Sequence, residues 1–343
     1  MKNMNLFING FAMTLLMTMA AIAHQPDYKV MDKIKVEGDG GWDYLSVDTM
    51  HNRLFISHST VVNVLDLETK KLVQTIPDTK GVHGIAIAYN LNKGFISNGK
   101  DTSVTVFDLT SLKTLNVIKV TGNNPDAILY DAFSGKVFTF NGRSSNSTVI
   151  DAASGKILGT IALEGKPEFS VTDGKGKVYV NIEDKSEICE IDPVAMKVNR
   201  RWSIAPGEEP SGLAIDVKNQ KLFSVCDNKM MVVSDIATGK IIAHVSIGDR
   251  VDGTAFDAAA GIIYSSNGDG TLTVIKQESA DKYSVEENVD TQKGARTIAL
   301  NPKTHHVYLP TAEFGDAPPA TNENPHPRPQ VKPGTFVVLE CGK

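Results

Sequence analysis

The stretch GVHGIAIAYNLNKGFISNGKDTSVTVFDL (81–109) decides the fold of this chain. It contains three short runs rich in Val, Ile and Phe, at 81–88, 94–98 and 104–109, and Gly, Asn, Asp and Lys separate them. Runs of this length and composition, bounded by turn residues, predict β-strands. Apolar residues do not recur every 3.6 positions over any useful length, so we expect an all-β protein.

The same pattern occurs seven times along the chain, with the quoted stretch as its second copy. The aligned segments are spaced by 40 to 44 residues, counted between their third positions, and a second and third strand-like run follow each of them. In most repeats a polar turn then leads to a fourth run, such as KILGTIAL (156–163). The seven segments are GWDYLSVD (41–48), GVHGIAIA (81–88), NPDAILYD (124–131), KPEFSVTD (166–173), EPSGLAID (209–216), RVDGTAFD (250–257) and GARTIALN (294–301).

Four strands in about 42 residues are typical of one blade of a β-propeller. A single blade leaves both faces of its sheet open, whereas blades arranged in a circle cover one another. The seventh repeat ends after its third strand, and YKVMDKIKV (28–36) precedes the first repeat. We therefore predict a single seven-bladed β-propeller over residues 24–343, in which this N-terminal strand completes the last blade and closes the ring.

The repeats resemble those of the YVTN-repeat family of β-propellers. The resemblance rests on an apolar strand with an aromatic residue and a closing Asn, followed by alternating apolar residues, as in GFISNGKDTSVTVFD (94–108) and IYSSNGDGTLTVI (263–275). The literal YVTN does not occur, and Tyr179-Val180-Asn181 is the nearest match. The resemblance implies a propeller in an extracytoplasmic location, and it implies no single chemistry.

Residues 1–23 are expected to form a secretory signal peptide. Lys2 is the only charge in this segment, an apolar run extends from Phe11 to Ala23, and Ala21-Ile22-Ala23 has small residues where a signal peptidase cleaves. The apolar run is shorter than the ~20 residues that span a bilayer, which makes a membrane anchor the weaker interpretation. Cleavage would leave a periplasmic or secreted protein without a membrane span.

Charge and motifs narrow the function classes. The chain carries 35 Lys and Arg against 40 Asp and Glu, a formal charge of −5, which argues against nucleic-acid binding because that function needs a basic face. Phosphate loops, G-x-S-x-G, H-E-x-x-H and C-x-x-C-H sequences are missing. Aspartates at the end of most third strands are expected to accept backbone N–H groups in turns; they are Asp66, Asp108, Asp151, Asp192 and Asp235.

The aligned segments turn the predicted ring into a map of a candidate site. The inner strand of each propeller blade lines the central channel, and the third position of each segment lies where that strand begins, on the face that we call the top. This position mixes carboxylates, an imidazole, a hydroxyl and a guanidinium. Gathered carboxylates repel unless a cation or a proton offsets them, so the mixture favours a site over a solvated channel mouth. The seven residues are Asp43, His83, Asp126, Glu168, Ser211, Asp252 and Arg296.

A second ring follows the aromatic residues of the second strands. His58 belongs to it and is followed by Ser59, so no turn role explains it, whereas Asn98, Asn141 and Asn267 each precede Gly, which is typical of a tight turn with positive φ. Asn98 remains a candidate ligand contact. Two imidazoles and two carboxylates suit a divalent ion such as Zn, Mn or Fe. The candidate metal ligands are Asp43, His58, His83 and Asp126.

Residues 316–333, DAPPATNENPHPRPQVKP, contain six of the fifteen prolines. In the repeat they replace a short turn between the second and third strands of the last blade, so we expect them on the top face. Pro-rich segments are semi-rigid and extended, which suits a lid over the channel or a strip that docks a protein. As a lid, the segment would offer His326 and Arg328 as ligand contacts.

Three functions remain open. The first is an exported protein that binds a small polar ligand or a metal-ligand complex at the top of the channel. The second is a metal-dependent lyase or lactone hydrolase that uses the same ring, with His83 as general acid or base, carboxylates on the metal, and Arg296 on a substrate anion. The third is a protein-interaction scaffold. Candidate catalytic residues are His83, Asp126, Glu168 and Arg296; candidate ligand contacts are Asp43, His58, Asn98, Ser211, Asp252, His326 and Arg328.

Overall fold

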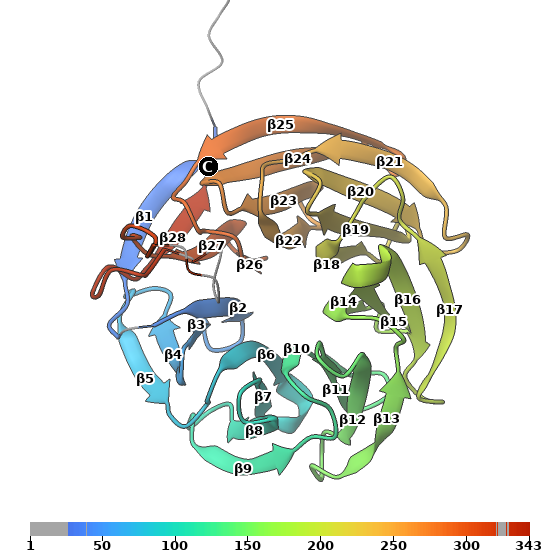
Figure 1. Cartoon of the computed structure of the whole chain (residues 1–343), viewed down its shortest axis with the longest axis horizontal. Coiled ribbons are helices and arrows are strands. Elements are labelled where there is room, and N and C mark those ends of the chain that lie inside the picture. Colours follow the sequence, from blue (N-terminus) through green and yellow to red (C-terminus); the bar gives the residue numbers. More distant parts are fainter. Residues whose placement is uncertain (1–26, 39, 320, 322–326, 328) are drawn as a thin grey trace, which may run out of the picture.

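The computed structural model describes residues 27–343 except 39, 320, 322–326 and 328, and it is a ring of seven antiparallel four-stranded sheets (Figure 1). Blades one to three are β2 (Trp42–Asp48), β3 (Arg53–His58), β4 (Val61–Asp66) and β5 (Leu72–Ile76); β6 (Val82–Ala88), β7 (Lys93–Asn98), β8 (Ser103–Asp108) and β9 (Thr114–Lys119); and β10 (Pro125–Asp131), β11 (Lys136–Asn141), β12 (Asn146–Asp151) and β13 (Ile157–Ala162).

Blades four to seven are β14 (Pro167–Thr172), β15 (Val178–Ile182), β16 (Glu187–Asp192) and β17 (Lys197–Ser203); β18 (Pro210–Asp216), β19 (Lys221–Cys226), β20 (Met230–Asp235) and β21 (Ile241–Ser246); β22 (Val251–Asp257), β23 (Ile262–Asn267), β24 (Thr271–Ser279) and β25 (Lys282–Asp290); and β26 (Ala299–Asn301), β27 (His306–Thr311), β28 (Val337–Gly342) and β1 (Lys29–Lys35). The predicted all-β, seven-bladed fold is confirmed.

Blade seven contains both the first and the last strand of the fold. Strand β1 pairs antiparallel with β28, and the pairs include Lys33 with Leu339 and Lys35 with Val337. The pairing covers the edge of β28 that would otherwise expose unpaired N–H and C=O groups. The prediction that the N-terminal strand closes the ring is therefore confirmed.

Helical structure is scarce in the described part of the chain. It consists of two single 3₁₀ turns, η1 (Tyr89–Leu91) and η2 (Glu183–Lys185). Within the same residues, no helix has the length and apolar character needed to cross a membrane. The expected signal peptide, residues 1–23, lies outside the described residues.

The core lies between the blades. Phe55 of β3 meets Phe107 of β8 with ring centroids 5.4 Å apart, and Phe223 of β19 meets Phe256 of β22 at 5.2 Å. Each such ring joins neighbouring blades, and full burial of a Phe side chain contributes about 2–3 kcal/mol. Packing between sheets thus fixes the circular order on which the channel depends.

Aspartate carboxylates hold the turns on the face opposite the candidate site, which we call the bottom. The Asp66 carboxylate accepts from the Thr69 amide N–H at 2.7 Å, and that of Asp151 accepts from the Ser154 amide at 2.8 Å. The same bond recurs two blades further on, where Asp235 accepts from Thr238. The turn role predicted for these aspartates is confirmed.

A β-bulge marks the start of the inner strand in six of the seven blades. The pairing register shifts within Trp42–Leu45, Val82–Ile85, Pro125–Ile128, Pro167–Ser170, Pro210–Leu213 and Val251–Gly253. A bulge leaves a residue unpaired and re-aims its side chain. Each shift contains the third residue of an aligned segment, which explains why five of these side chains, all except that of Ser211, leave the sheet and turn toward the channel.

Candidate functional site

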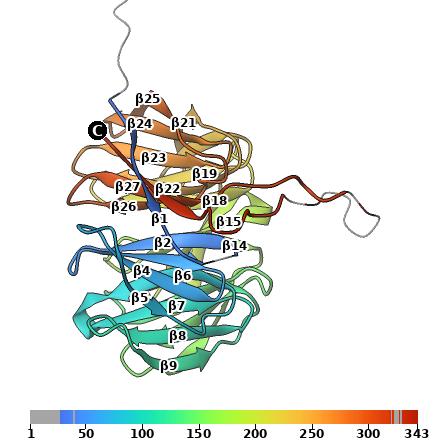
Figure 2. The same cartoon turned by 90° about the vertical axis from the view of Figure 1, so that its left-hand side faces the viewer.

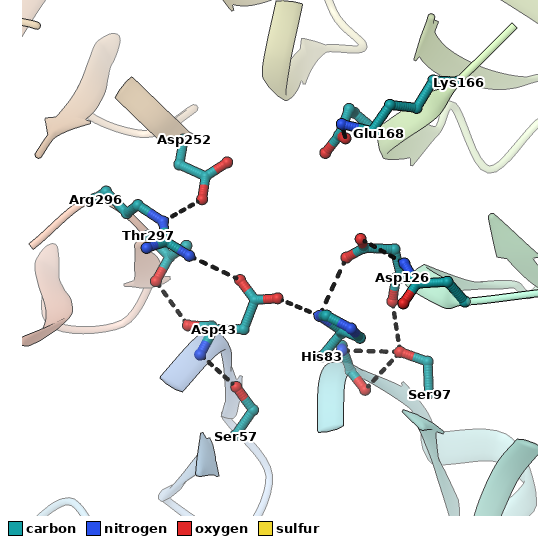
Figure 3. A network of polar contacts seen from close by, with 12 residues as sticks. Asp43, Ser57, His83, Ser97, Asp126, Lys166, Glu168, Asp252, Arg296 and Thr297 are labelled. Carbon is teal, nitrogen blue, oxygen red and sulfur yellow. Dashed lines mark hydrogen bonds and ion pairs between the residues drawn. The ribbon is translucent and has the colours of Figure 1, made fainter. Parts of the chain in front are cut away.

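Three residues from three consecutive blades form the centre of the site. His83 Nδ1 lies 2.5 Å from Asp43 Oδ2 and 3.4 Å from Asp126 Oδ1 (Figure 3). The amide of Asn124 donates to the other oxygen of Asp126 at 3.3 Å. The imidazole therefore joins two carboxylates that would otherwise repel each other.

Arg296 plays the same part on the other side of Asp43. Its Nε donates to Asp252 Oδ2 at 2.6 Å, and its terminal nitrogen lies 4.0 Å from Asp43 Oδ1. Asp43 consequently stands between two cationic side chains, the imidazolium of His83 and the guanidinium of Arg296. Figure 3 shows this continuous chain of contacts from Asp252 to Asp126.

Glu168 completes the acidic part of the ring from blade four. Lys166 Nζ lies 2.9 Å from its carboxylate and also pairs with Glu183. Glu168 is 8% exposed, and Figure 3 shows its carboxylate directed toward the open centre of the ring. Six of the seven predicted ring residues thus take part in a common cluster of charges.

Ser211 is the exception. Its hydroxyl donates to the backbone carbonyl of Val251 at 3.2 Å, and the neighbouring Asn181 amide donates to the carbonyl of Ser211 at 3.0 Å. This serine joins blades five and six, so its contacts in the structure are structural ones rather than contacts to the charged cluster.

Hydroxyl groups fix the backbone beneath the ring. The Asp43 amide donates to Ser57 Oγ at 2.9 Å, and Thr297 Oγ1 donates to the Asp43 carbonyl at 2.7 Å. Ser97 Oγ donates to the Asp126 carbonyl, and Ser266 Oγ donates to the Arg296 carbonyl, both at 2.5 Å. The Ser57 bond lies within blade one, the other three run from one blade to the next, and together they hold the charged side chains in place.

Burial and neighbouring charges shift the pKa values of the ring. Burial lowers the pKa of His83, but the hydrogen bond to Asp43 and the charges of the acids outweigh it and raise the pKa to about 9. Burial, opposed by the charge of His83, raises the pKa of Asp126 to about 6. Burial and the charge of Asp126 raise the pKa of Glu168 to about 8, against the effect of Lys166. At neutral pH His83 is therefore a cation.

Two aromatic residues form a floor below the ring. Tyr44 of β2 and Phe169 of β14 meet with ring centroids 5.3 Å apart, although they belong to blades one and four. Figure 1 shows β2 and β14 on different sides of the channel, so their contact spans it. Burial and the charges of the four ring carboxylates raise the pKa of Tyr44 well above its usual value. The charged ring is therefore the upper part of a cup whose base these two side chains form.

A cavity of about 360 Å³ opens above blades one to three and seven. Its wall contains Asp43, His83 and Arg296 of the ring, and it also contains two basic side chains that the sequence did not single out, Lys100 and Arg143. Lys100 and Arg143 follow the Asn-Gly pairs of blades two and three. That repeated position, and Lys166 two residues before Glu168, were the signals available in the sequence.

His58 lies outside this cluster, which corrects its prediction as a ligand or metal contact. It is 2% exposed, its Nδ1 lies 3.1 Å from Asn63 Oδ1, and its ring packs at a tilt of 34° against Phe336 with centroids 4.3 Å apart. The last residue of β3 points into the space between sheets rather than toward the channel axis. Burial among these neighbours leaves no route to Asp43 or Asp126.

Asn98 is also a structural residue, contrary to its prediction as a ligand contact. It is fully buried, and its amide donates to Ser103 Oγ at 3.1 Å and Thr105 Oγ1 at 2.9 Å. The predicted positive φ at Gly99 is wrong as well, because the left-handed residue of this turn is Thr102, with φ 50°. The longer turn lets Asn98 bond across the hairpin.

The geometry of Asp43, His83 and Asp126 suits a small cation. One ligand atom from each lies within 4.8 Å of the other two. Two carboxylate oxygens and an imidazole nitrogen are a donor set that Zn, Mn and Fe accept in proteins. No other group of three such residues comes this close among the residues that the structure describes.

The described residues of the Pro-rich segment extend away from the top face and do not cross the channel. Phe314 pairs with Val331, and Gly315 donates to the Gln330 carbonyl at 2.8 Å. In Figure 2 the described parts on either side of the loop tip extend away from the disk. His326 and Arg328, the candidate lid contacts, lie outside the described residues.

Comparison with known proteins supports the architecture. Models of known families and curated proteins give no match to this sequence. Among solved structures, a chain of the "Crystal Structure of Mitotic Checkpoint Complex" is similar with a TM-score of 0.75 and 11% identity, over 99% of both chains. Hydrazine synthase of Kuenenia stuttgartiensis is similar with a TM-score of 0.68 and 16% identity, over 80% of this chain and 94% of that one. Identity this low concerns the fold alone, and the fold is a seven-bladed β-propeller.

Proposed function

We propose that this protein binds a small polar ligand in the cup at the top of its channel. The observation that carries the proposal is the convergence of four carboxylates and the cations His83 and Arg296 above an aromatic floor, beside a cavity of about 360 Å³. A volume of this size fits a small molecule rather than a peptide segment. Charges of both signs in one enclosed place favour a ligand that is itself charged.

Binding is better supported than general-base catalysis. A base must be unprotonated at the working pH, whereas the two carboxylates around His83 raise its pKa to about 9. Arg296 is paired with Asp252 and is not directed at an empty anion site. A lyase or hydrolase that uses His83 as its general base therefore has less support from this geometry than ligand capture has.

A metal-ligand complex is the second candidate, because Asp43, His83 and Asp126 lie within 4.8 Å of one another. These residues would hold a divalent ion, which would in turn attract the anionic part of a ligand. The ion must first displace the proton of His83, so its affinity should rise with pH up to about 9. A ligand that leaves His83 protonated should show no such rise from this residue.

We also propose export and kinship with the YVTN-repeat propellers. The support is the sequence of residues 1–23, with its charge, apolar run and Ala21-Ile22-Ala23, and the repeated strand pattern. A periplasmic or secreted location would put the cup in contact with small solutes outside the cell. N-terminal sequencing of the protein recovered from a cell envelope fraction would show whether the chain begins at His24.

The binding proposal is tested with the purified protein. Mass spectrometry identifies co-purifying molecules and metals, and thermal-shift and calorimetric screens cover amino acids, amines, sugar acids and divalent ions. Asp126→Asn should raise the dissociation constant of any ligand found about tenfold or more. Glu208→Gln, an exposed change outside the cup, should leave it unchanged. A protein partner that binds equally well to the Asp126→Asn variant would instead support the scaffold function.

A further inference from the structure

The charges around the cup are unevenly compensated. From Arg296 through Asp43 to His83, acids and cations alternate, and every carboxylate in this arc touches a cation. From Asp126 to Asp252, no ring position carries a cation, and Ser211 is turned to the backbone of Val251. Each carboxylate here has one cationic partner (His83, Lys166 or Arg296), whereas Asp43 has two. Lys166, the nearest cation to this arc, is shared with Glu183 behind Glu168.

The floor of the cup adds an independent observation. Tyr44 is 7% exposed, and the charges of Asp126, Asp43, Asp252 and Glu168 all act on its hydroxyl. Among the described residues this hydroxyl has no hydrogen-bond partner. The hydroxyl oxygen keeps some solvent access, so it is free to accept a hydrogen bond from a ligand in the cup.

The arc is too wide for one metal ion. Asp43, His83 and Asp126 come within 4.8 Å of one another, and neither Glu168 nor Asp252 joins that group. Metal ligands must lie at about 2.0–2.2 Å from the ion, whereas an ammonium or guanidinium nitrogen reaches oxygens at about 2.7–2.9 Å in several directions. Figure 3 shows the carboxylates of Asp252, Glu168 and Asp126 around an open centre.

We propose that the cup selects small molecules by a protonated amine or guanidinium group, which lies between Asp126, Glu168 and Asp252 above the Tyr44 hydroxyl. This inference rests on the proposed ligand-binding function and names the chemistry of the ligand. The carboxylate of a zwitterion would then face the basic wall of the cavity, where Lys100 and Arg143 lie.

The wild-type protein is tested by calorimetry with matched probes. Arginine is compared with citrulline, which has the same shape without the charge, and lysine is compared with N6-acetyllysine. The cationic member of at least one pair should bind about tenfold or more tightly than its neutral partner, because a hydrogen bond between charged groups is lost in the neutral one. Equal binding within both pairs overturns the inference.

Variants locate the cation. Measured at about pH 9, where the Glu168 carboxylate is ionised, Glu168→Gln should weaken the cationic probe about tenfold or more, and Tyr44→Phe should weaken it about threefold or more, because each removes one acceptor at the centre of the arc. Glu208→Gln is the control, and circular dichroism confirms that each variant is folded. Unchanged affinity in folded Glu168→Gln overturns the inference.

The remaining outcomes separate this inference from the proposed function. If only anionic or neutral compounds bind, and Asp126→Asn abolishes that binding, the function stands and the cation inference fails. If ZnCl₂ or MnCl₂ binds alone, with loss in His83→Ala and no loss in Glu168→Gln, the cation belongs to the Asp43–His83–Asp126 group and the inference fails. If no compound or ion binds the wild-type protein, both fail.

Discussion

His83 owes its position to two neighbours that are distant in sequence. Asp43 lies 40 residues before it and Asp126 lies 43 residues after it, so each belongs to an adjacent blade. The repeat length therefore sets the chemistry of this imidazole as much as its own strand does. A carboxylate on either side stabilises the protonated form and makes His83 a structural cation of the ring.

The ring should make the protein less stable at alkaline pH. The pKa values of Glu168 and His83, about 8 and 9, lie above the ordinary values of 4.5 and 6.5. The stability contributed by Glu168 is fully present below pH ~4.5 and is lost as pH rises through about 8; that of His83 is lost between ~6.5 and 9. Each group lowers the unfolding free energy by at most ~1.4 kcal/mol per pH unit in its window. Denaturant unfolding between pH 5 and 9 measures this decline.

Glu168→Gln provides the check on that prediction. Gln does not titrate, so the decline between pH 5 and 8 should become shallower in this variant, although Lys166, Asp126 and Glu183 remain around the site. Glu208→Gln should keep the slope of the wild type. Identical slopes in all three proteins would show that Glu168 is not held protonated.

Among the strands, β1 is short but important for stability, because it closes the ring. Ile34 of this strand is 5% exposed and packs with Tyr308 and Val338, whereas Met31 of the same strand is 43% exposed. Ile34→Ala should lower the unfolding free energy by about 2–5 kcal/mol. Met31→Ala should change it by about 0.5 kcal/mol or less, since surface changes rarely do more. Similar losses in both variants, measured by urea unfolding, would mean that β1 is not packed as described.

The strands could be predicted from the sequence because their side chains alternate between two faces over a few residues. Alternation within each run, and the 40 to 44 residue spacing, identified the blades, the ring residues and the role of β1. The direction in which individual side chains point was harder to predict from the sequence. His58 and Asn98 end second strands on the same face as the ring, but they point between sheets, and only the pairing register determines this. The bulges that aim Asp43 and its counterparts have no signature in a single strand.

At the scale of the whole molecule, the contact between Tyr44 and Phe169 is the feature that no local pattern indicates. The two residues are 125 positions apart in sequence, and their contact depends on the diameter of the closed ring. Lys100 and Arg143 were likewise missed because they reach the cavity from exposed turns. A prediction of the cup required the positions of all seven blades at once.

Removal of the Phe169 side chain should destabilise the whole circle of blades. Phe169 is half-buried, so Phe169→Ala should lower the unfolding free energy by about 1–3 kcal/mol, below the range for a fully buried Phe. Phe133→Ala is the control, because Phe133 is 56% exposed, and it should change this free energy by about 0.5 kcal/mol or less. Urea unfolding of both variants is the measurement. Equal stability of the two variants would mean that the Tyr44–Phe169 contact across the channel contributes nothing to the stability of the fold.

The pairing of β1 with β28 also governs the order in which the molecule can be made. Blades one to six can form while the chain is still emerging from a ribosome, but β1 has no partner until residues 337–342 arrive. The opening between the first and sixth blades must then be filled by the last strands in one step. Assembly therefore finishes at the C-terminal end, and a chain that stops short of β28 leaves the circle open.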